Sequence, residues 1–365
     1  MHHSVSEAIE AFAKGALVIV TDDDDRENEG DLIIAASHCT TEKMAFIIRN
    51  CCGIVCAPLS SAEAKRLHLN PMVASNDAPL GTAFTVTVDV KHGLTTGISA
   101  EQRSNTVRAL ANGNMGANDF VRPGHVFPLR ARPGGVLERA GHTEAAVDIS
   151  RLAGLYPAGV ICEVMNDDGS MARLPDLIAF AQTHGLKIGT IADLIAYRRR
   201  NERFVERVLD EPFQSAYGGD FRLMIYRNTL DGGEHAALVK GRIEPGQPTL
   251  VRMHTVDFFA DMLGHLETRR TFVPAALRRI AEHDGPGVAV FLRDPSPNVL
   301  SERIGHGHVE YMGRRALREY GVGAQILLDL GVRDMILMSS MTTTPAALDG
   351  YGLKIVGRTP MPTEE

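Results

Sequence analysis

The sequence predicts two domains of the α+β or α/β class, a mixed α/β domain followed by a second α/β domain. Its 365 residues are many for a single hydrophobic core and sufficient for two. Apolar runs of strand length alternate with segments of helical periodicity along the chain. The most charged mid-chain stretch starts at Tyr197. We therefore place the first domain at 1–200, a connector at 201–216 and the second domain at 217–365.

Periodicity, caps and turns assign the elements of each half. In the first half we expect helices at 6–14, 41–50, 101–112 and 174–184, with Thr41 capping the second and Gly185 ending the fourth. Strands are expected at 16–21, 31–36, 84–88 and 158–165. In the second half we expect strands at 221–226, 235–240 and 249–254, followed by alternating helices and strands.

The composition limits the classes of function. A hydrophobic content of 44%, a charged content of 23% and a net charge of -7 describe a globular protein and argue against a nucleic-acid-coating role. No apolar run is long enough to span a membrane. The first residues lack the features of a signal peptide, so we expect a cytoplasmic protein with reduced thiols. Cys51, Cys52 and Cys56 could suggest a metal cluster, but small buried hydrophobic residues are the favoured interpretation.

An acidic loop between two apolar strands is the first candidate site. Residues 22–31 contain seven acids in ten positions, together with Arg26 and Gly30. Like charges at this density need a cation or full solvation. Carboxylate oxygens are hard ligands, which suit Mg²⁺ or Mn²⁺. Taken alone, an acidic loop is more often a solvated surface, so both interpretations stay open at this point.

Another candidate is the stretch from Arg139 to Ala145. Thr143 is a plausible N-cap for a helix that runs to about Leu152. The free N–H groups at the start of a helix favour phosphate, and Arg139 would add a charged fork to the same anion. A plain capped helix is the alternative.

Two isolated titratable residues complete the set. His125 lies between turn residues and an apolar strand, where it could serve as a general acid or base. Glu163 interrupts an apolar strand, and a buried carboxylate needs a partner or a task. A structural histidine is the favoured interpretation of His125 when it is taken in isolation.

These stretches together resemble the 3,4-dihydroxy-2-butanone 4-phosphate synthase family. The resemblance rests on "DDDDRENEGDLI", "GIVC", "FTVTVDVKHGLTTGIS", "RPGHVFPLRA", "GGVLERAGHTEA", "YPAGVICEVMNDDGSMAR" and "TIADLIAYR", and it runs from about Val5 to Arg200. It implies a synthase-type domain that converts D-ribulose 5-phosphate to L-3,4-dihydroxy-2-butanone 4-phosphate and formate in riboflavin biosynthesis. It also implies a Mg²⁺-dependent homodimer with sites near the subunit interface.

The resemblance assigns roles by position. Glu27 and His142 would be the metal ligands, and His125 and Glu163 the catalytic acid–base residues. The substrate-binding residues would be Arg26, Glu27, Asp31, Arg139, Ala140, Gly141, His142, Thr143 and Glu163. One position departs from the family, because Gln102 occupies the place of an aspartate. If that acid orients a substrate group or a loop, we expect reduced turnover.

The second half resembles GTP cyclohydrolase II from about Tyr217 to Pro360, in "GDFRLMIY", "GGEHAALVKG", "PTLVRMHTVD", "REYGVGAQILLDLGV" and "GLKIVGRTP". That family binds zinc through three cysteines, whereas no cysteine follows Cys162 here. The two places where that family has its zinc ligands read His254 to Asp257 and Glu267 to Arg270. Asp294 to Asn298 replaces the nucleotide-contact loop, and Ala316 replaces a catalytic acid, although Arg318 is kept. We therefore expect no zinc and no cyclohydrolase activity.

Three interpretations of the whole chain remain. We favour an active synthase fused to an inactive cyclohydrolase-like domain, which regulates the synthase or binds a protein partner from the riboflavin pathway. The first alternative is a non-catalytic regulatory protein of that pathway. The second is a bifunctional enzyme in which His254, Asp257 and His265 form a substitute metal site. No nucleic acid or membrane partner is expected.

Overall fold

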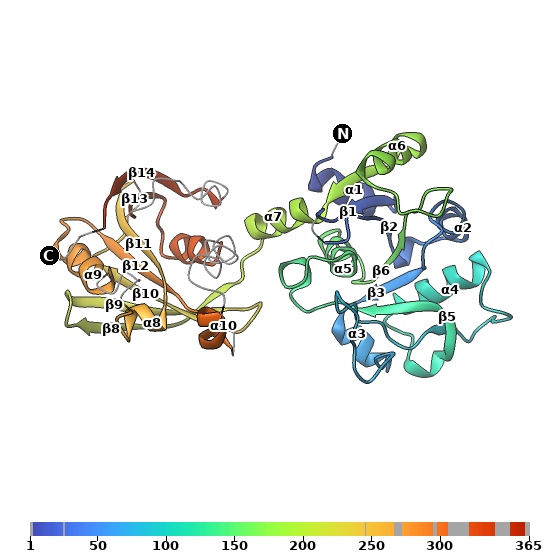
Figure 1. Ribbon diagram of the computed structural model, residues 1–365, viewed down its shortest axis with the longest axis horizontal. Helices are drawn as coiled ribbons and strands as arrows, with labels where there is room; N and C mark the ends of the chain where they lie inside the picture. Colours follow the sequence, from blue (N-terminus) through green and yellow to red (C-terminus); the bar gives the residue numbers. More distant parts are fainter. Residues whose placement is uncertain are drawn as a thin grey trace. The chain divides into compact units, whose positions relative to one another are not determined.

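The computed structural model describes residues 3–24, 26–244, 246–265, 272–294, 298–305, 321–339 and 351–361. The chain divides into two compact units, Met1–Arg198 and Arg199–Glu365, each built around a mixed sheet (Figure 1). The prediction of two α/β domains is confirmed. No helix among the described residues combines the length and the apolar character needed to cross a bilayer.

The sheet of the first unit carries the candidate site residues. Its strands, in spatial order, are β4 (Val88–Val90), β5 (Phe120–Arg130), β3 (Cys56–Leu59), β6 (Gly159–Glu163), β2 (Gly30–Ala35), β1 (Val18–Thr21) and β7 (Lys187–Thr190). Its helices are α1 (Val5–Ala13), α2 (Thr41–Asn50), α3 (Ser61–Arg66), α4 (Ala100–Leu110), α5 (His142–Leu152), α6 (Leu174–His184) and α7 (Ile191–Asn201). The pairs β1–β7 and β3–β5 are parallel, and the other neighbouring pairs of this sheet are antiparallel.

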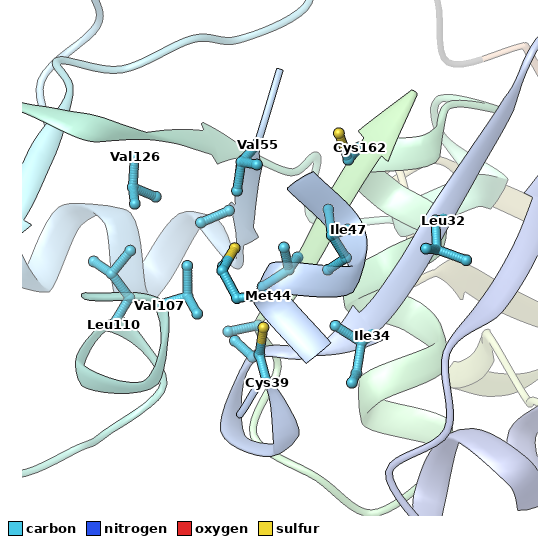
Figure 2. Close-up of a cluster of buried hydrophobic side chains, with 14 of the residues drawn as sticks. Leu32, Ile34, Cys39, Met44, Ile47, Val55, Val107, Leu110, Val126 and Cys162 are labelled. Atoms are coloured by element: carbon cyan, nitrogen blue, oxygen red, sulfur yellow. The ribbon is translucent and has the colours of Figure 1, made fainter. Parts of the chain in front are cut away.

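Alternation along β2 divides the hydrophobic core between the two faces of this sheet. Leu32 and Ile34 pack with residues of α2, α4 and α6, as Figure 2 shows for Met44 and Val107. Ile33 packs on the opposite face with residues of α1, α5 and α7. Both faces are therefore covered, and a polar residue such as Asp31 can stand in this strand only at its end.

Three local expectations were wrong. Residues 84–88 do not form one strand: Phe84 and Thr85 make single bridges, and regular pairing starts at Val88. The reason is that Val86 N–H donates to Asn70 O instead of to a strand neighbour.

The N-caps of two helices also differ from the prediction. The N-cap of α2 is Thr40, whose side chain accepts from Lys43 N, and Thr41 is the first helical residue. α5 is capped by Gly141 rather than by Thr143. The helix Leu174–His184 ends at left-handed Gly185, as predicted.

The second unit has its own sheet and core. In spatial order its strands are β14 (Lys354–Thr359), β13 (Asp334–Met338), β11 (Thr249–Thr255), β12 (Gly287–Leu292), β10 (Glu234–Lys240), β9 (Gly219–Asn228) and β8 (Val205–Ser215). Its described helices are α8 (Phe258–Asp261), α9 (Phe272–Glu282), α10 (Val299–Gly305) and the helix 321–329. The segment expected as a connector, 201–216, contains β8, whose Val205 belongs to this core.

Candidate active site

The acidic loop between β1 and β2 is organised by one of its own carboxylates. Asp22 is buried, and its Oδ2 accepts from Arg26 Nη1 at 2.8 Å and from Glu27 N at 3.0 Å. Its Oδ1 accepts from Glu29 N at 2.8 Å. Arg26 Nη1 also contacts Glu27. The crowded charges are therefore separated by backbone N–H groups and one guanidinium, which leaves Glu27 presented towards α5.

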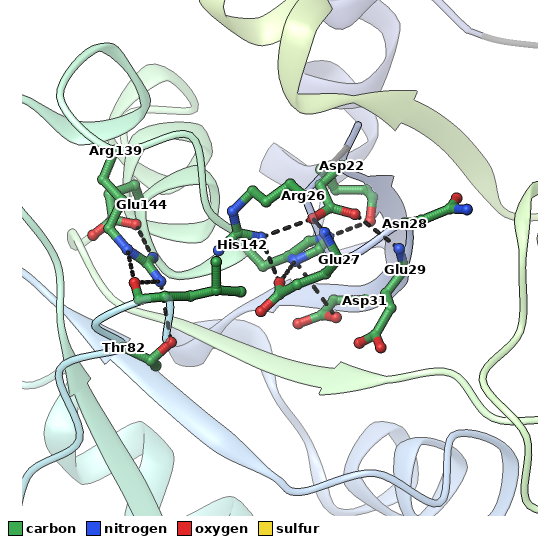
Figure 3. A network of polar contacts seen from close by, with 12 residues as sticks. Asp22, Arg26, Glu27, Asn28, Glu29, Asp31, Thr82, Arg139, His142 and Glu144 are labelled. Carbon is green, nitrogen blue, oxygen red and sulfur yellow. Dashed lines mark hydrogen bonds and ion pairs between the residues drawn. The ribbon is translucent and has the colours of Figure 1, made fainter. Parts of the chain in front are cut away.

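His142 is the first residue of α5 and faces this loop (Figure 3). Its Nε2 donates to Val20 O at 3.1 Å, so Nδ1 is directed at two carboxylates. Nδ1 lies 3.7 Å from Glu27 Oε2 and 3.8 Å from Asp31 Oδ1. Because a backbone carbonyl fixes the second nitrogen, the ring is held in the orientation that a metal ligand requires.

The charges in this cluster are strongly coupled. Hydrogen bonding to His142, reinforced by Arg26, lowers the pKa of Glu27 to about 2 against the effect of burial. Burial alone would lower the pKa of His142, but Asp31 and Glu27 raise it to about 9. Burial raises the pKa of Asp31 to about 7, although His142 opposes that rise. Without a metal, an imidazolium at neutral pH neutralises these acids.

A divalent cation fits the same place. Ligand atoms of Asp22, Glu27 and His142 lie within 4.8 Å of one another. Both oxygens of Asp22 already accept loop hydrogen bonds, so Glu27 and His142 Nδ1 are the better ligands, with Asp31 beside them. Carboxylate oxygens with a single imidazole suit a hard cation. The cation would take over the charge that the imidazolium supplies without it.

Glu163 ends β6 directly beside Asp31, its partner on β2. Its Oε2 accepts from Ile54 N at 2.9 Å. A side chain at position 53 would overlap this carboxylate, so the turn before β3 requires Gly53. The carboxylate of Glu163 is thus held at the end of its strand next to the metal-type cluster, where it could exchange a proton with a bound substrate.

His125 lies on β5 and is paired with Asp89 of β4. His125 Nδ1 donates to Asp89 Oδ2 at 2.7 Å, and the backbone N–H of His125 donates to Oδ1 at 2.9 Å. The Asp89 side chain is 3% exposed and that of His125 is 42% exposed. A buried acid that holds Nδ1 leaves Nε2 free to face outward, the arrangement of an oriented general acid or base.

The sheet separates His125 from the other site residues of the same chain. Phe127 pairs with Cys56, and Cys56 pairs with Ile161, so His125 is level with Glu163 two strands away. At the usual strand spacing this is about 10 Å, and β2 with Asp31 is one strand further. The fold of one chain therefore brings together Arg26, Glu27, Asp31, His142 and Glu163, and it places His125 apart from them.

The segment Arg139–Thr143 leads into α5. Arg139 Nη1 donates to Glu144 Oε2 at 2.7 Å, and Nη2 donates to Thr82 Oγ1 at 3.1 Å. Ala140 is half-buried, and Gly141, the N-cap, allows the backbone to pass close to the Arg139 guanidinium. No side chain caps α5 at Gly141, so N–H groups at its start stay available to an anion. Thr143 is buried in the first turn.

Sequence reasoning missed three supporting acids: Asp22, Asp89 and Glu144. Asp89 and Glu144 are both buried, and each holds a candidate residue in place. No signal marked Asp89 in the sequence, because it takes a polar position of the alternating "TVTVDV" pattern, where exposure to solvent is expected. Asp22 was not marked either, since it stands among other polar residues, and Glu144 was not marked because an acid in the first turn of a helix is common on the surface.

Two of the three substitute ligands considered for the second unit, His254 and Asp257, already bind other side chains. His254 Nε2 lies 2.8 Å from Asp261 Oδ2, and Asp257 Oδ2 accepts from Arg303 at 2.8 and 2.9 Å. Across the described residues, a metal-type group of three ligands occurs only in the first unit. The positions Glu267 to Arg270, Ala316 and Arg318 lie outside the described residues.

The mixed sheet with its carboxylate–histidine cluster defines an α/β enzyme with a divalent-cation site. Residues 6–197 match the family described as 3,4-dihydroxy-2-butanone 4-phosphate synthase, and residues 206–360 match GTP cyclohydrolase II. The chain belongs to the 3,4-dihydroxy-2-butanone 4-phosphate synthase family, whose members are lyases of riboflavin biosynthesis, and it carries a GTP cyclohydrolase II-type second domain. Both resemblances seen in the sequence are confirmed.

Two relatives span nearly the whole chain. A bifunctional riboflavin biosynthesis protein from the chloroplast of Arabidopsis thaliana is 47% identical over 378 residues, which cover 98% of this chain and 69% of that protein. A 3,4-dihydroxy-2-butanone 4-phosphate synthase of Pseudomonas aeruginosa is 46% identical over 359 residues, which cover 97% of this chain and 98% of that protein. Relatives with both domains thus carry both kinds of name.

Solved structures give the same result. RibBX, a two-domain 3,4-dihydroxy-2-butanone 4-phosphate synthase from A. baumannii, has a TM-score of 0.75 at 41% identity and covers 99% of this chain and 100% of its own. A synthase in complex with two magnesium ions has a TM-score of 0.53 at 46% identity, covering 55% of this chain and 98% of its own. That complex and the cluster around His142 together support a divalent cation here.

Proposed function

We propose that the chain converts D-ribulose 5-phosphate to L-3,4-dihydroxy-2-butanone 4-phosphate and formate. The observation that carries this proposal is the position of His142, whose Nδ1 faces Glu27 and Asp31 at 3.7 and 3.8 Å. Glu163 pairs with Asp31 on the adjacent strand. Ligands for a hard cation therefore lie beside a proton-transfer group, which suits a reaction that begins by removing a proton next to a ketone.

Each residue has a distinct task in this proposal. Glu27 and His142 would hold Mg²⁺, or Mn²⁺ in its place, and the cation would supply stabilisation of negative charge on the substrate oxygens. Arg26 and Asp31 bind substrate hydroxyls beside it. Glu163 and His125 move the protons during the loss of water, the shift of the carbon skeleton and the release of formate.

The phosphate of the substrate binds the segment Arg139–Thr143. The backbone N–H groups of His142 and Thr143 lie in the first turn of α5, where the helix supplies them no partner, whereas the N–H of Gly141 donates to Arg139 O. Arg139 is held there by Glu144 and Thr82, so its charge is already in place when the phosphate arrives.

The protein acts as a homodimer with sites near the subunit interface. The separation of His125 from Glu163 by two strands within one chain supports this arrangement. A second copy could bring its own His125 to the cluster around His142. An exposed imidazole that is nevertheless oriented by a buried acid is suited to such a shared site.

Incubating the full chain with D-ribulose 5-phosphate and Mg²⁺ tests the proposal. We expect one formate and one four-carbon phosphate for each pentose phosphate consumed, because the reaction splits five carbons into four and one. No formate from a folded, Mg²⁺-loaded chain would favour the non-catalytic regulatory alternative. Asp24→Asn is a matched control, because Asp24 is an exposed acid of the same loop outside the ligand set.

We propose that the second unit, Arg199–Glu365, has no cyclohydrolase activity and acts as a regulatory or partner-binding domain. Asp257 lies in the stretch where the family has its first zinc ligand, and it is bound to the buried Arg303. A guanidinium at this place opposes a cation. The Pseudomonas aeruginosa and A. baumannii relatives, both matched along the second domain, are named only for the synthase.

The purified chain is therefore expected to release neither formate nor pyrophosphate from GTP, with or without added Zn²⁺. Release would be followed by high-performance liquid chromatography, with a zinc-containing cyclohydrolase as the positive control. The name of the Arabidopsis thaliana relative keeps a bifunctional enzyme as the competing candidate. Zinc-dependent turnover of GTP that disappears in His254→Ala would decide for that candidate.

A further inference from the structure

The segment between β4 and α4 lies directly on the Asp89–His125 pair. Gly97, buried and with a φ of +94°, is at the point of contact. A side-chain carbon on this residue would overlap both Asp89 Oδ2 and His125 Nδ1. Only glycine satisfies the backbone conformation and the space together, so the backbone at Gly97 forms one wall around the imidazole.

The side chain of Gln102 fastens this segment from the first turn of α4. It is 9% exposed, and its Oε1 accepts from Gly97 N. Its Nε2 donates to Thr95 Oγ1 at 2.6 Å and to Gly93 O at 3.3 Å. The start of α4 is itself fixed, because Ser99 Oγ accepts from Gln102 N at 3.2 Å.

These contacts use both halves of an amide. One oxygen accepts from the backbone, while the nitrogen donates to a hydroxyl and to a carbonyl. A carboxylate could take over the first contact and could accept from the Thr95 hydroxyl, but it would face the Gly93 carbonyl without a hydrogen to donate. The glutamine at this position therefore completes a network that an acid would leave partly unsatisfied.

We propose that Gln102 is a positioning residue for the lyase reaction, which holds residues 93–97 against the Asp89–His125 pair and so keeps His125 in its working orientation. The inference rests on the proposed acid–base role of His125. Residues 93, 95 and 96 are exposed, so few other contacts hold this segment in place. Without the Gln102 amide, the backbone at Gly97 loses its hydrogen bond to Oε1 and no longer packs firmly against the imidazole of His125.

The expected kinetic signature is a loss of kcat with little change in KM. Gln102→Met keeps length and helix propensity but removes all three hydrogen bonds. Because the residues assigned to the cation and the phosphate lie in the β1–β2 loop and around the start of α5, not in the segment 93–97, we expect a kcat lower by about ten- to a hundredfold with KM within about twofold. Gln102→Glu, which keeps the acceptor for Gly97, should recover most of the rate. Asn105→Met, an exposed position on the same helix, should match the wild type.

A measurement independent of activity separates positioning from the proposed function. Hydrogen exchange at the Gly97 amide should accelerate in Gln102→Met and stay slow in Asn105→Met. If the wild type releases no formate, the proposed function fails. Slow exchange of the Gly97 amide would still show that the Gln102 side chain holds this segment.

Should Gln102→Met fail to fold, Gly97→Ala tests the same contact, since its methyl group pushes on the Asp89–His125 pair with Gln102 intact. Wild-type kcat in either folded variant would overturn the proposal.

Discussion

Replacing Glu27 by glutamine should lower formate production by about a thousandfold, the largest effect we expect from one substitution. The change keeps the size of the side chain but removes the charge that faces His142 Nδ1 at 3.7 Å. Exhaustive chelation with EDTA should abolish activity in the wild type, and added Mg²⁺ should restore it. Asp24→Asn, which removes the same charge from an exposed part of the loop, should keep near-normal activity. Full activity after chelation would contradict the assignment.

The pKa of His142 gives this prediction a pH dependence. Without metal, the carboxylates raise the pKa of His142 to about 9, so the ring carries a proton at neutral pH. A metal binds only the neutral ring, so binding must release that proton. The apparent affinity for Mg²⁺ should therefore rise with pH, by up to about tenfold per unit below pH 9. Calorimetry in buffers of different ionisation enthalpy measures the protons released, and a pH-independent affinity would argue against His142 as a ligand.

Local sequence patterns predicted helix and strand ends well where a local preference of the backbone decides the structure. The helix Leu174–His184 ends at Gly185 as expected, because a left-handed C-cap is a local event in which glycine has a clear advantage. The predicted N-cap of α5 was wrong because the actual N-cap, Gly141, has no side chain that could mark it. Its backbone is extended, with φ -123° and ψ 159°, and the helix starts at His142 without a side-chain cap. β8 was taken as a connector because its residues are mostly polar, whereas its pairing with β9 depends on distant residues.

The site was predictable in its residues but not in its geometry. Motif resemblance named Glu27, Asp31 and His142, and the structure brings them together, because β1, β2 and the start of α5 meet at one end of the sheet. Nothing in the sequence shows that Val20 O fixes the ring of His142, since a backbone carbonyl leaves no mark on residue identity. The spacing of His125 from Glu163 is likewise a property of strand order, which one sequence does not reveal.

His125→Asn and Glu163→Gln should each lower kcat by about a hundredfold or more while leaving the protein folded. Each change removes a proton-transfer group from a residue that is partly open to solvent, so the melting temperature should change little. Near-normal turnover in either variant would remove that residue from the catalytic set.

Mixing the two inactive variants tests whether a site is shared between subunits. If His125 of one copy serves Glu163 of the other, a mixed dimer contains one site with both substitutions and one with neither. Unfolding and refolding an equal mixture should then restore about a quarter of the wild-type rate, because half of the dimers are mixed and each has one intact site. If both residues act within one chain, every site carries a substitution and the mixture stays inactive. The separation of about 10 Å between these residues in one chain favours the first outcome.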